Sequence, residues 1–69
     1  NQKEEAKSSL VLSIQKKLRS NGFYLGTIDG KLGPNTKAAI NVYQLENGLV
    51  ASGMPSIQLL DFIERETNK

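Results

Sequence analysis

The sequence predicts an all-α fold, a small three-helix bundle with a long ordered loop between the first and second helices. Three observations predict it: apolar residues recur at helical spacing in three segments, Asn-Gly pairs follow two of these segments, and a proline precedes two of them. The 69 residues are enough for one small domain. Because cysteine and histidine are absent, no disulfide and no zinc site of the usual kind can stabilise it. We therefore expect no metal and no cofactor.

The first helix is expected from about Ser9 to Ser20, with Ser8 or Ser9 as its N-cap. Its apolar residues lie within about 100° of one another on a helical wheel: Leu10, Val11, Ile14 and Leu18. The Asn21-Gly22 pair is expected to end it, because glycine readily adopts the left-handed conformation that follows a helix. Residues 1–8 are interpreted as a flexible arm or linker, residues 9–66 as the domain, and residues 67–69 as a tail.

The second helix is expected to open at Gly33-Pro34, because proline favours the first helical position, and to end at Asn47-Gly48. It carries one apolar stripe of Thr36, Ala39, Ile40 and Tyr43, and a second strip of Ala38, Val42 and Leu45. Since it has two apolar strips, we expect this middle helix to contact both others. The third helix is expected from about Ser56 to Glu66, with Leu59, Leu60 and Ile63 facing inward.

The stretch from Gly22 to Thr36 holds four glycines and a proline, yet apolar residues are interleaved among them: Phe23, Leu25, Ile28 and Leu32. A flexible linker would not carry so many apolar side chains, so we interpret this stretch as an ordered loop that folds back on the core. In an extended Phe23-Tyr24 pair only one side chain can point inward. We expect Phe23 to be buried and Tyr24 to lie on the surface.

Short motifs follow one another along the chain in a recognisable order. They are Ile-Gln-Lys-Lys-Leu with Gln15 and Leu18, Asn-Gly-Phe-Tyr-Leu-Gly, Ile-Asp-Gly, Leu-Gly-Pro-Asn-Thr, Ala-Ala-Ile, Tyr-Gln and Asn-Gly-Leu. This series, from about Leu10 to Ile63, resembles the three-helix peptidoglycan-binding-like domain that is appended to bacterial and phage cell-wall enzymes. The resemblance implies a non-catalytic module that targets an attached domain to peptidoglycan, in the periplasm, the cell envelope or the cell exterior.

With this resemblance, the candidate ligand-binding residues are Tyr24, Asp29, Asn35, Thr36, Lys37 and Asn41. A surface Tyr24 ring could stack on a sugar. The Asp29 carboxylate either accepts a hydrogen bond from the ligand or accepts one from its own loop. Unpaired N–H groups at the start of the second helix favour an anion, such as a stem-peptide carboxylate, to which Lys37 would add charge. The expected partner is peptidoglycan, both glycan and stem peptide.

Catalysis is disfavoured, because the usual nucleophile dyads and triads need histidine or cysteine and the chain has neither. Glycoside hydrolysis needs two facing carboxylates, and Asp29 is the only acid between Glu5 and Glu46. No apolar run is long enough to cross a bilayer, so we expect no membrane insertion. Since the chain begins with Asn1 rather than methionine, we interpret it as a monomeric domain of a larger protein.

Two further functions stay open as alternatives. The first is a protein-interaction or structural domain of an envelope protein, because the second apolar strip and Leu12 could form an exposed patch. The second is DNA binding, which the net charge of +2 and the basic stretch from Lys16 to Lys37 could support. It is disfavoured, because the loop of about twelve residues between the first two helices is far longer than the turn of a helix-turn-helix.

Overall fold

The computed structural model describes residues 8–67, which form three α-helices and no strand. The helices are α1 (Ser9–Ser20), α2 (Pro34–Glu46) and α3 (Ile57–Thr67). The predicted all-α three-helix class is therefore confirmed, and α3 begins and ends one residue later than expected. The predicted arm and tail lie outside the described residues, except for Ser8, which caps α1, and Thr67, which ends α3.

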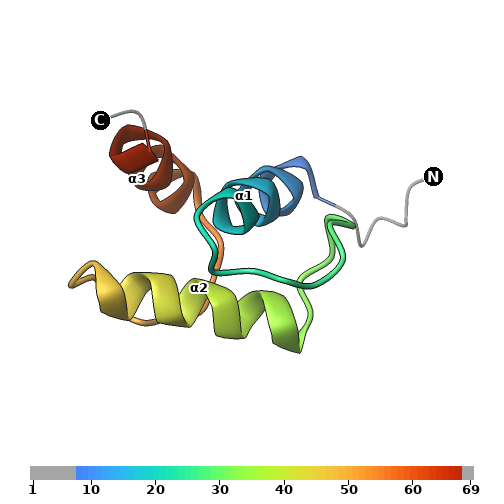
Figure 1. Ribbon diagram of the computed structural model, residues 1–69, viewed down its shortest axis with the longest axis horizontal. Coiled ribbons are helices and arrows are strands. Elements are labelled where there is room, and N and C mark those ends of the chain that lie inside the picture. The colour runs from blue at the N-terminus through green and yellow to red at the C-terminus, as the bar shows by residue number, and fades with distance from the viewer. Residues whose placement is uncertain (1–7, 68–69) are drawn as a thin grey trace.

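The helix that approaches both others is α1: in Figure 1 it lies beside α3, and α2 runs below them. The backbones of α2 and α3 each approach that of α1 closely and do not approach each other. The middle helix of the sequence nevertheless contacts both others, as expected: the Thr36 hydroxyl of α2 accepts from Gln15 of α1, and the Tyr43 ring of α2 packs against Phe62 of α3. An amphipathic pattern shows which face of a helix is buried, but it does not show which element covers that face.

The ends of α1 are fixed by its own sequence. The Ser8 hydroxyl caps the start by accepting a hydrogen bond from the Val11 N–H at 3.2 Å. At the other end Gly22 has a φ of 83°, and the Phe23 N–H donates to the Leu18 carbonyl at 2.8 Å. This is a Schellman motif, which satisfies carbonyls that the helix end would leave unpaired. The loop to α2 therefore leaves α1 in a fixed direction.

The core is built from the inward faces of all three helices and from the first loop. Its fully buried aliphatic side chains are Ile14, Leu18, Ile40 and Ile63. Tyr43 of α2 lies between two half-buried phenylalanine rings, with edge-to-face centroid distances of 5.1 Å to Phe23 and 6.2 Å to Phe62. Through these aromatic contacts α2 packs against α3, although the backbones of the two helices do not approach each other.

Tyr24 lies inside the core, so the expected orientation of the Phe23-Tyr24 pair is wrong. Only 5% of Tyr24 is exposed, whereas Phe23 is half-buried. The Tyr24 hydroxyl donates to the Thr27 carbonyl and lies 3.4 Å from the Gln15 side-chain nitrogen. Because its polar end is satisfied inside the protein, tyrosine can occupy a position that the sequence suggested only for phenylalanine.

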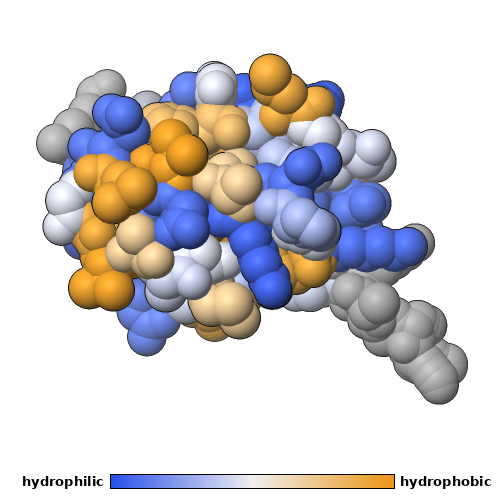
Figure 2. Space-filling model, turned by 90° about the horizontal axis from the view of Figure 1, so that it is seen from below, coloured by the Kyte–Doolittle hydropathy of each residue, from blue (hydrophilic) through white to orange (hydrophobic). Residues whose placement is uncertain are grey.

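The second apolar strip of α2 lies on the surface. Val42 is 47% and Leu45 is 68% exposed, and Leu25 of the first loop is 88% exposed. Figure 2 shows apolar groups gathered on this face of the molecule, towards the end at which α2 finishes. Leu12 is not part of this surface, contrary to the expectation, because it is half-buried and packs against Gly30.

Candidate functional site

The first loop is held to α1 by one buried side chain, that of Gln15. Its Oε1 accepts hydrogen bonds from the N–H groups of Asp29 and Gly30, at 3.0 and 2.8 Å. Its Nε2 faces several oxygens, the nearest being the Thr36 hydroxyl at 2.9 Å. Because Thr36 belongs to α2, a single amide joins α1, the loop and the start of α2. This arrangement positions both sides of the candidate site.

The Asp29 carboxylate takes part in the same network. Its Oδ1 accepts from the Lys31 N–H at 2.9 Å and from the Gln15 Nε2 at 3.2 Å. The Lys31 hydrogen bond, followed by that of Gln15, holds the pKa of this carboxyl below its ordinary value of 3.8. Asp29 is therefore ionised at neutral pH, and one of its two oxygens serves the loop's own structure.

The start of α2 leaves backbone donors open. Its N-cap is Gly33, which has no side chain to bond the first turn, and Pro34 follows at the first helical position. The first loop-to-helix hydrogen bond runs from the Lys37 N–H to the Gly33 carbonyl. Within residues 8–67 no acceptor lies opposite the N–H groups of Asn35 and Thr36. This helix start is suited to an acceptor or an anion.

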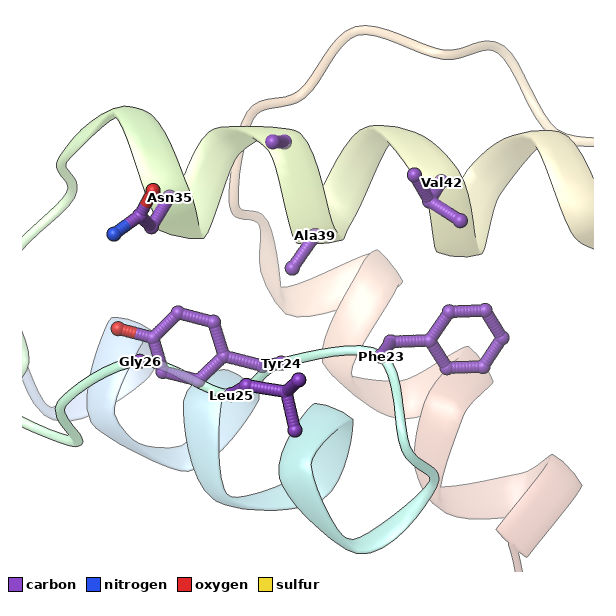
Figure 3. A pocket seen from close by; sticks show the side chains of 8 residues that line it. Phe23, Tyr24, Leu25, Gly26, Asn35, Ala39 and Val42 are labelled. Carbon is purple, nitrogen blue, oxygen red and sulfur yellow. The ribbon is translucent and has the colours of Figure 1, made fainter.

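A groove of about 410 Å³ lies between the first loop and α2 (Figure 3). Figure 3 shows Tyr24, Leu25 and Gly26 of the loop along one side and Asn35, Ala39 and Val42 of α2 along the other. Phe23 and Ala38 complete its lining. The walls are mainly small or apolar, and Asn35 supplies the polar side chain at one end.

A second hollow, of about 270 Å³, lies beside the start of α2. More of its lining side chains are polar than in the groove. The lining residues are Tyr24, Thr27, Asp29, Lys31, Gly33, Pro34, Asn35 and Thr36. Tyr24 and Asn35 line both hollows. The two hollows therefore adjoin and make up one candidate site, with mainly apolar side chains along α2 and mainly polar ones at its N-terminus.

The structure divides the six predicted site residues into two groups. It brings four of them together around the two hollows: Tyr24, Asp29, Asn35 and Thr36. Lys37 and Asn41 line neither hollow, because they lie on a different face of α2 from Asn35 and Val42. Asn41 is half-buried, and its amide lies against the space next to Gly53 in the loop before α3.

Sequence reasoning missed the role of Gln15 and the walls of the groove. Gln15 was noticed only as part of a motif, although a glutamine between Ile14 and Leu18 on a buried stripe is itself a signal of a buried polar contact. Ala38 and Val42 were assigned to a partner surface rather than to a groove. Their helical spacing from Asn35 could have placed all three on one face.

Other kinds of site are not formed by the described residues. In the range 8–67 no three Asp, Glu, His or Cys side chains gather in a way that could hold a metal ion. None of the helices in this range has the length and apolar character needed to span a bilayer.

Comparison with known proteins identifies relatives of this chain. A model of the peptidoglycan binding domain family matches residues 7–63. A relative, the N-acetylmuramoyl-L-alanine amidase CwlM of Mycobacterium tuberculosis (strain ATCC 25618 / H37Rv), is 43% identical over 44 residues. That match covers 64% of this chain but only 11% of the amidase. No solved structure matches the chain.

Proposed function

Because the chain belongs to the peptidoglycan binding domain family, we propose that it is a non-catalytic module that binds peptidoglycan and keeps an attached domain at the cell wall. The observation that carries this proposal is the pair of adjoining hollows beside the first loop, where a groove with apolar side chains lies next to open N–H groups of α2. The site is shallow and its residues suit binding. The module would work in the cell envelope, in the periplasm or outside the cell.

The attached domain is proposed by analogy with the relative. The amidase is named for an activity on N-acetylmuramoyl-L-alanine, and the matched segment is only 11% of its length. A small binding module would raise the local concentration of such a partner domain at the wall. A weak affinity per module is sufficient, because the polymer presents many sites in succession.

Co-sedimentation with purified peptidoglycan sacculi tests this proposal. The wild-type domain should move into the pellet, and Asn35→Ala should reduce the pelleted fraction because Asn35 borders both hollows. Lys37→Ala and Asn41→Ala are the matched controls from the same helix, and we expect both to pellet like the wild type. Failure of the folded wild-type domain to pellet would exclude the proposal. Stronger losses for the two controls than for Asn35→Ala would move the site to the other face of α2.

A second candidate function rests on the exposed apolar side chains beside the groove. Leu25, Val42 and Leu45 are large, apolar and solvent-exposed, which is typical of a surface that contacts another protein or domain. Sedimentation equilibrium of the isolated domain distinguishes this function. Self-association that Leu45→Lys abolishes, together with no binding to sacculi, would favour it over the first. A monomer that binds sacculi would favour peptidoglycan binding.

A further inference from the structure

The four aromatic residues of the chain do not offer a platform for a sugar. The sequence has no tryptophan, and its aromatic residues are Phe23, Tyr24, Tyr43 and Phe62. Both tyrosines are buried, and both phenylalanines are half-buried in edge-to-face contact with Tyr43. Holding a sugar by stacking requires the open face of a ring, and no ring here is fully exposed.

The groove is also poor in hydrogen-bonding side chains. Along α2 its wall consists of Ala38, Ala39 and Val42, with Asn35 at one end. A sugar ring carries polar groups around most of its edge, and burying them against methyl groups would leave them unpaired. A short peptide with methyl side chains suits the groove better. Its apolar groups can be buried favourably in the space of about 410 Å³ beside the alanines.

The loop wall of the groove has an unpaired main chain that a peptide could use. Leu25 lies in an irregular stretch between Tyr24 and Gly26, and within residues 8–67 no hydrogen bond reaches its N–H or its carbonyl. An extended peptide pairs readily with such a segment through main-chain hydrogen bonds. The Gly26 carbonyl is already engaged by the Arg19 guanidinium, which fixes the loop from the side of α1.

The polar end of the site is complementary to a carboxylate. The open N–H groups of Asn35 and Thr36 lie there, together with the lining residue Lys31. Asp29 is the only acid that lines this end, and its Oδ1 is engaged by the Lys31 N–H and by Gln15. Because the two hollows share Tyr24 and Asn35, a ligand with an apolar stretch and a terminal carboxylate could occupy both.

We infer that this site binds the stem peptide of peptidoglycan and not its glycan chain. The inference rests on the proposed function and specifies which part of the polymer is recognised. The peptide lies along Leu25 with its alanine methyl groups against Ala38 and Ala39. One of its carboxylates lies at the start of α2.

Amide chemical-shift titration of the ¹⁵N-labelled domain with two probes tests the inference. The first probe is a synthetic stem tetrapeptide, and the second is soluble glycan from which an amidase has removed the peptides. We expect the tetrapeptide to shift the amide signals of residues 23–27 and 35–42 and the glycan to leave them unchanged. Shifts at these residues with the glycan, and none with the tetrapeptide, would overturn the inference.

A pair of alanine substitutions provides a matched control. Ala38→Leu places a larger side chain in the groove, whereas Ala51→Leu makes the same change at an exposed position in the second loop. We expect Ala38→Leu to weaken tetrapeptide binding about tenfold or more, because it occupies the ligand's space, and Ala51→Leu to leave it unchanged. Equal affinities of the two variants would contradict the inference.

Sedimentation with sacculi separates this inference from the proposed function. If the domain pellets with sacculi but binds the peptide-free glycan, the proposed function stands and the inference fails. If the domain does not pellet, both fail. A domain that pellets with sacculi and does not bind the peptide-free glycan supports both.

Discussion

The two loops of this protein begin in the same way and are held by the same type of residue. They differ in the cap that each provides for the backbone N–H groups of the helix that follows. Residues 21–33 and residues 47–56 each start with Asn-Gly and a glycine of positive φ. Each is held by a buried glutamine of the preceding helix: Gln15 accepts from the Gly30 N–H at 2.8 Å, and Gln44 from the Gly53 N–H at 2.9 Å. The shared device fixes a loop against the helix that precedes it.

The difference lies in the number of groups that each glutamine holds and in the helix that follows. Gln15 also holds the Asp29 N–H and the Thr36 hydroxyl, whereas the further partner of Gln44 is the Ser52 hydroxyl at 3.3 Å. At the start of α3 the Ser56 hydroxyl accepts from the Leu59 N–H at 3.0 Å, but α2 starts at Gly33 without a side-chain cap. The third N–H group of α2, that of Thr36, is therefore left open for a ligand, whereas the Ser56 side chain pairs the corresponding N–H of Leu59 in α3.

The largest effect is expected from Gln15→Leu. It would leave the N–H groups of Asp29 and Gly30 without their acceptor. Each unsatisfied buried donor costs about 1–3 kcal/mol, so we expect a loss of about 2–6 kcal/mol. Urea unfolding followed by far-ultraviolet circular dichroism measures it. Gln44→Leu is the matched variant and should lose about half as much, because only the Gly53 N–H is affected. Equal losses would show that the two loops are held alike.

Gly30→Ala is expected to come next, at about 2 kcal/mol. Gly30 has a φ of 74°, which disfavours any side chain, and a Cβ there would lie 3.2 Å from the Ser8 carbonyl oxygen. Gly22→Ala is the control, because Gly22 has a φ of 83° but open space around its Cβ position. In thermal unfolding, the melting temperature of Gly30→Ala should be lower than that of Gly22→Ala. The reverse order would mean that the first loop can move away from α1 at little cost.

Tyr43→Phe tests the core between the two loops. The Tyr43 hydroxyl is buried without a hydrogen-bond partner among the described residues, so its removal should leave stability unchanged or raise it by up to about 1 kcal/mol. Burial, and then the charge of Glu66, raise the pKa of Tyr43 above 10.0. The folded state keeps this proton to a higher pH, so the associated stability is complete below pH 10.0 and is lost as the pH rises towards the raised pKa. The Tyr43→Phe variant should not show this loss of stability at alkaline pH when unfolding is measured against pH. A variant less stable than the wild type would indicate that the Tyr43 hydroxyl does have a hydrogen-bond partner.

The smallest effect is expected from Asp29→Asn, and it disappears as the pH falls into the acid range. The folded-state pKa of Asp29 is lowered, so its contribution to stability is complete above its ordinary value of 3.8 and is lost as the pH falls through the lowered pKa. The second loop contains no acid, so this dependence belongs to the first loop alone. Stability measured against pH should therefore decline less steeply in acid for Asp29→Asn than for the wild type. If the free energy of unfolding fell equally with pH in both proteins, the hydrogen bonds from Lys31 and Gln15 to the Asp29 carboxylate would not contribute to stability.

The helices were predictable from the sequence because their signals are local. Helical spacing defined the buried stripes, and Gly22 and Gly48 have the positive φ values that end α1 and α2. Gln44 of α2 accepts from the Gly53 N–H and so fixes the second loop. The close approach of α1 to both other helices was not predictable, since a stripe does not reveal its partner helix. The burial of Tyr24 depended on a carbonyl at Thr27 and an amide at Gln15 that only the folded loop brings near.

The candidate site was predictable in part. The uncapped start of α2 follows from Gly33-Pro34, and its N–H groups lie at the polar hollow as expected. The groove itself needs the loop to lie parallel to α2 at a fixed distance, which Gln15 determines through contacts distant in sequence. Lys37 and Asn41, although close to Asn35 in sequence, lie away from the groove because the helical repeat places them on another face of α2.

The central claim is that the ligand binds beside the first loop and not beside the second. A soluble muropeptide that carries both sugar and peptide, titrated into the ¹⁵N-labelled domain, tests it most directly. The account predicts that amide shifts concentrate in residues 23–27 and 35–42. The amides of Leu49, Ser56 and Gln58, which border a hollow of about 280 Å³ between the second loop and α3, should stay unchanged. Shifts that concentrate at Leu49, Ser56 and Gln58 instead would contradict it.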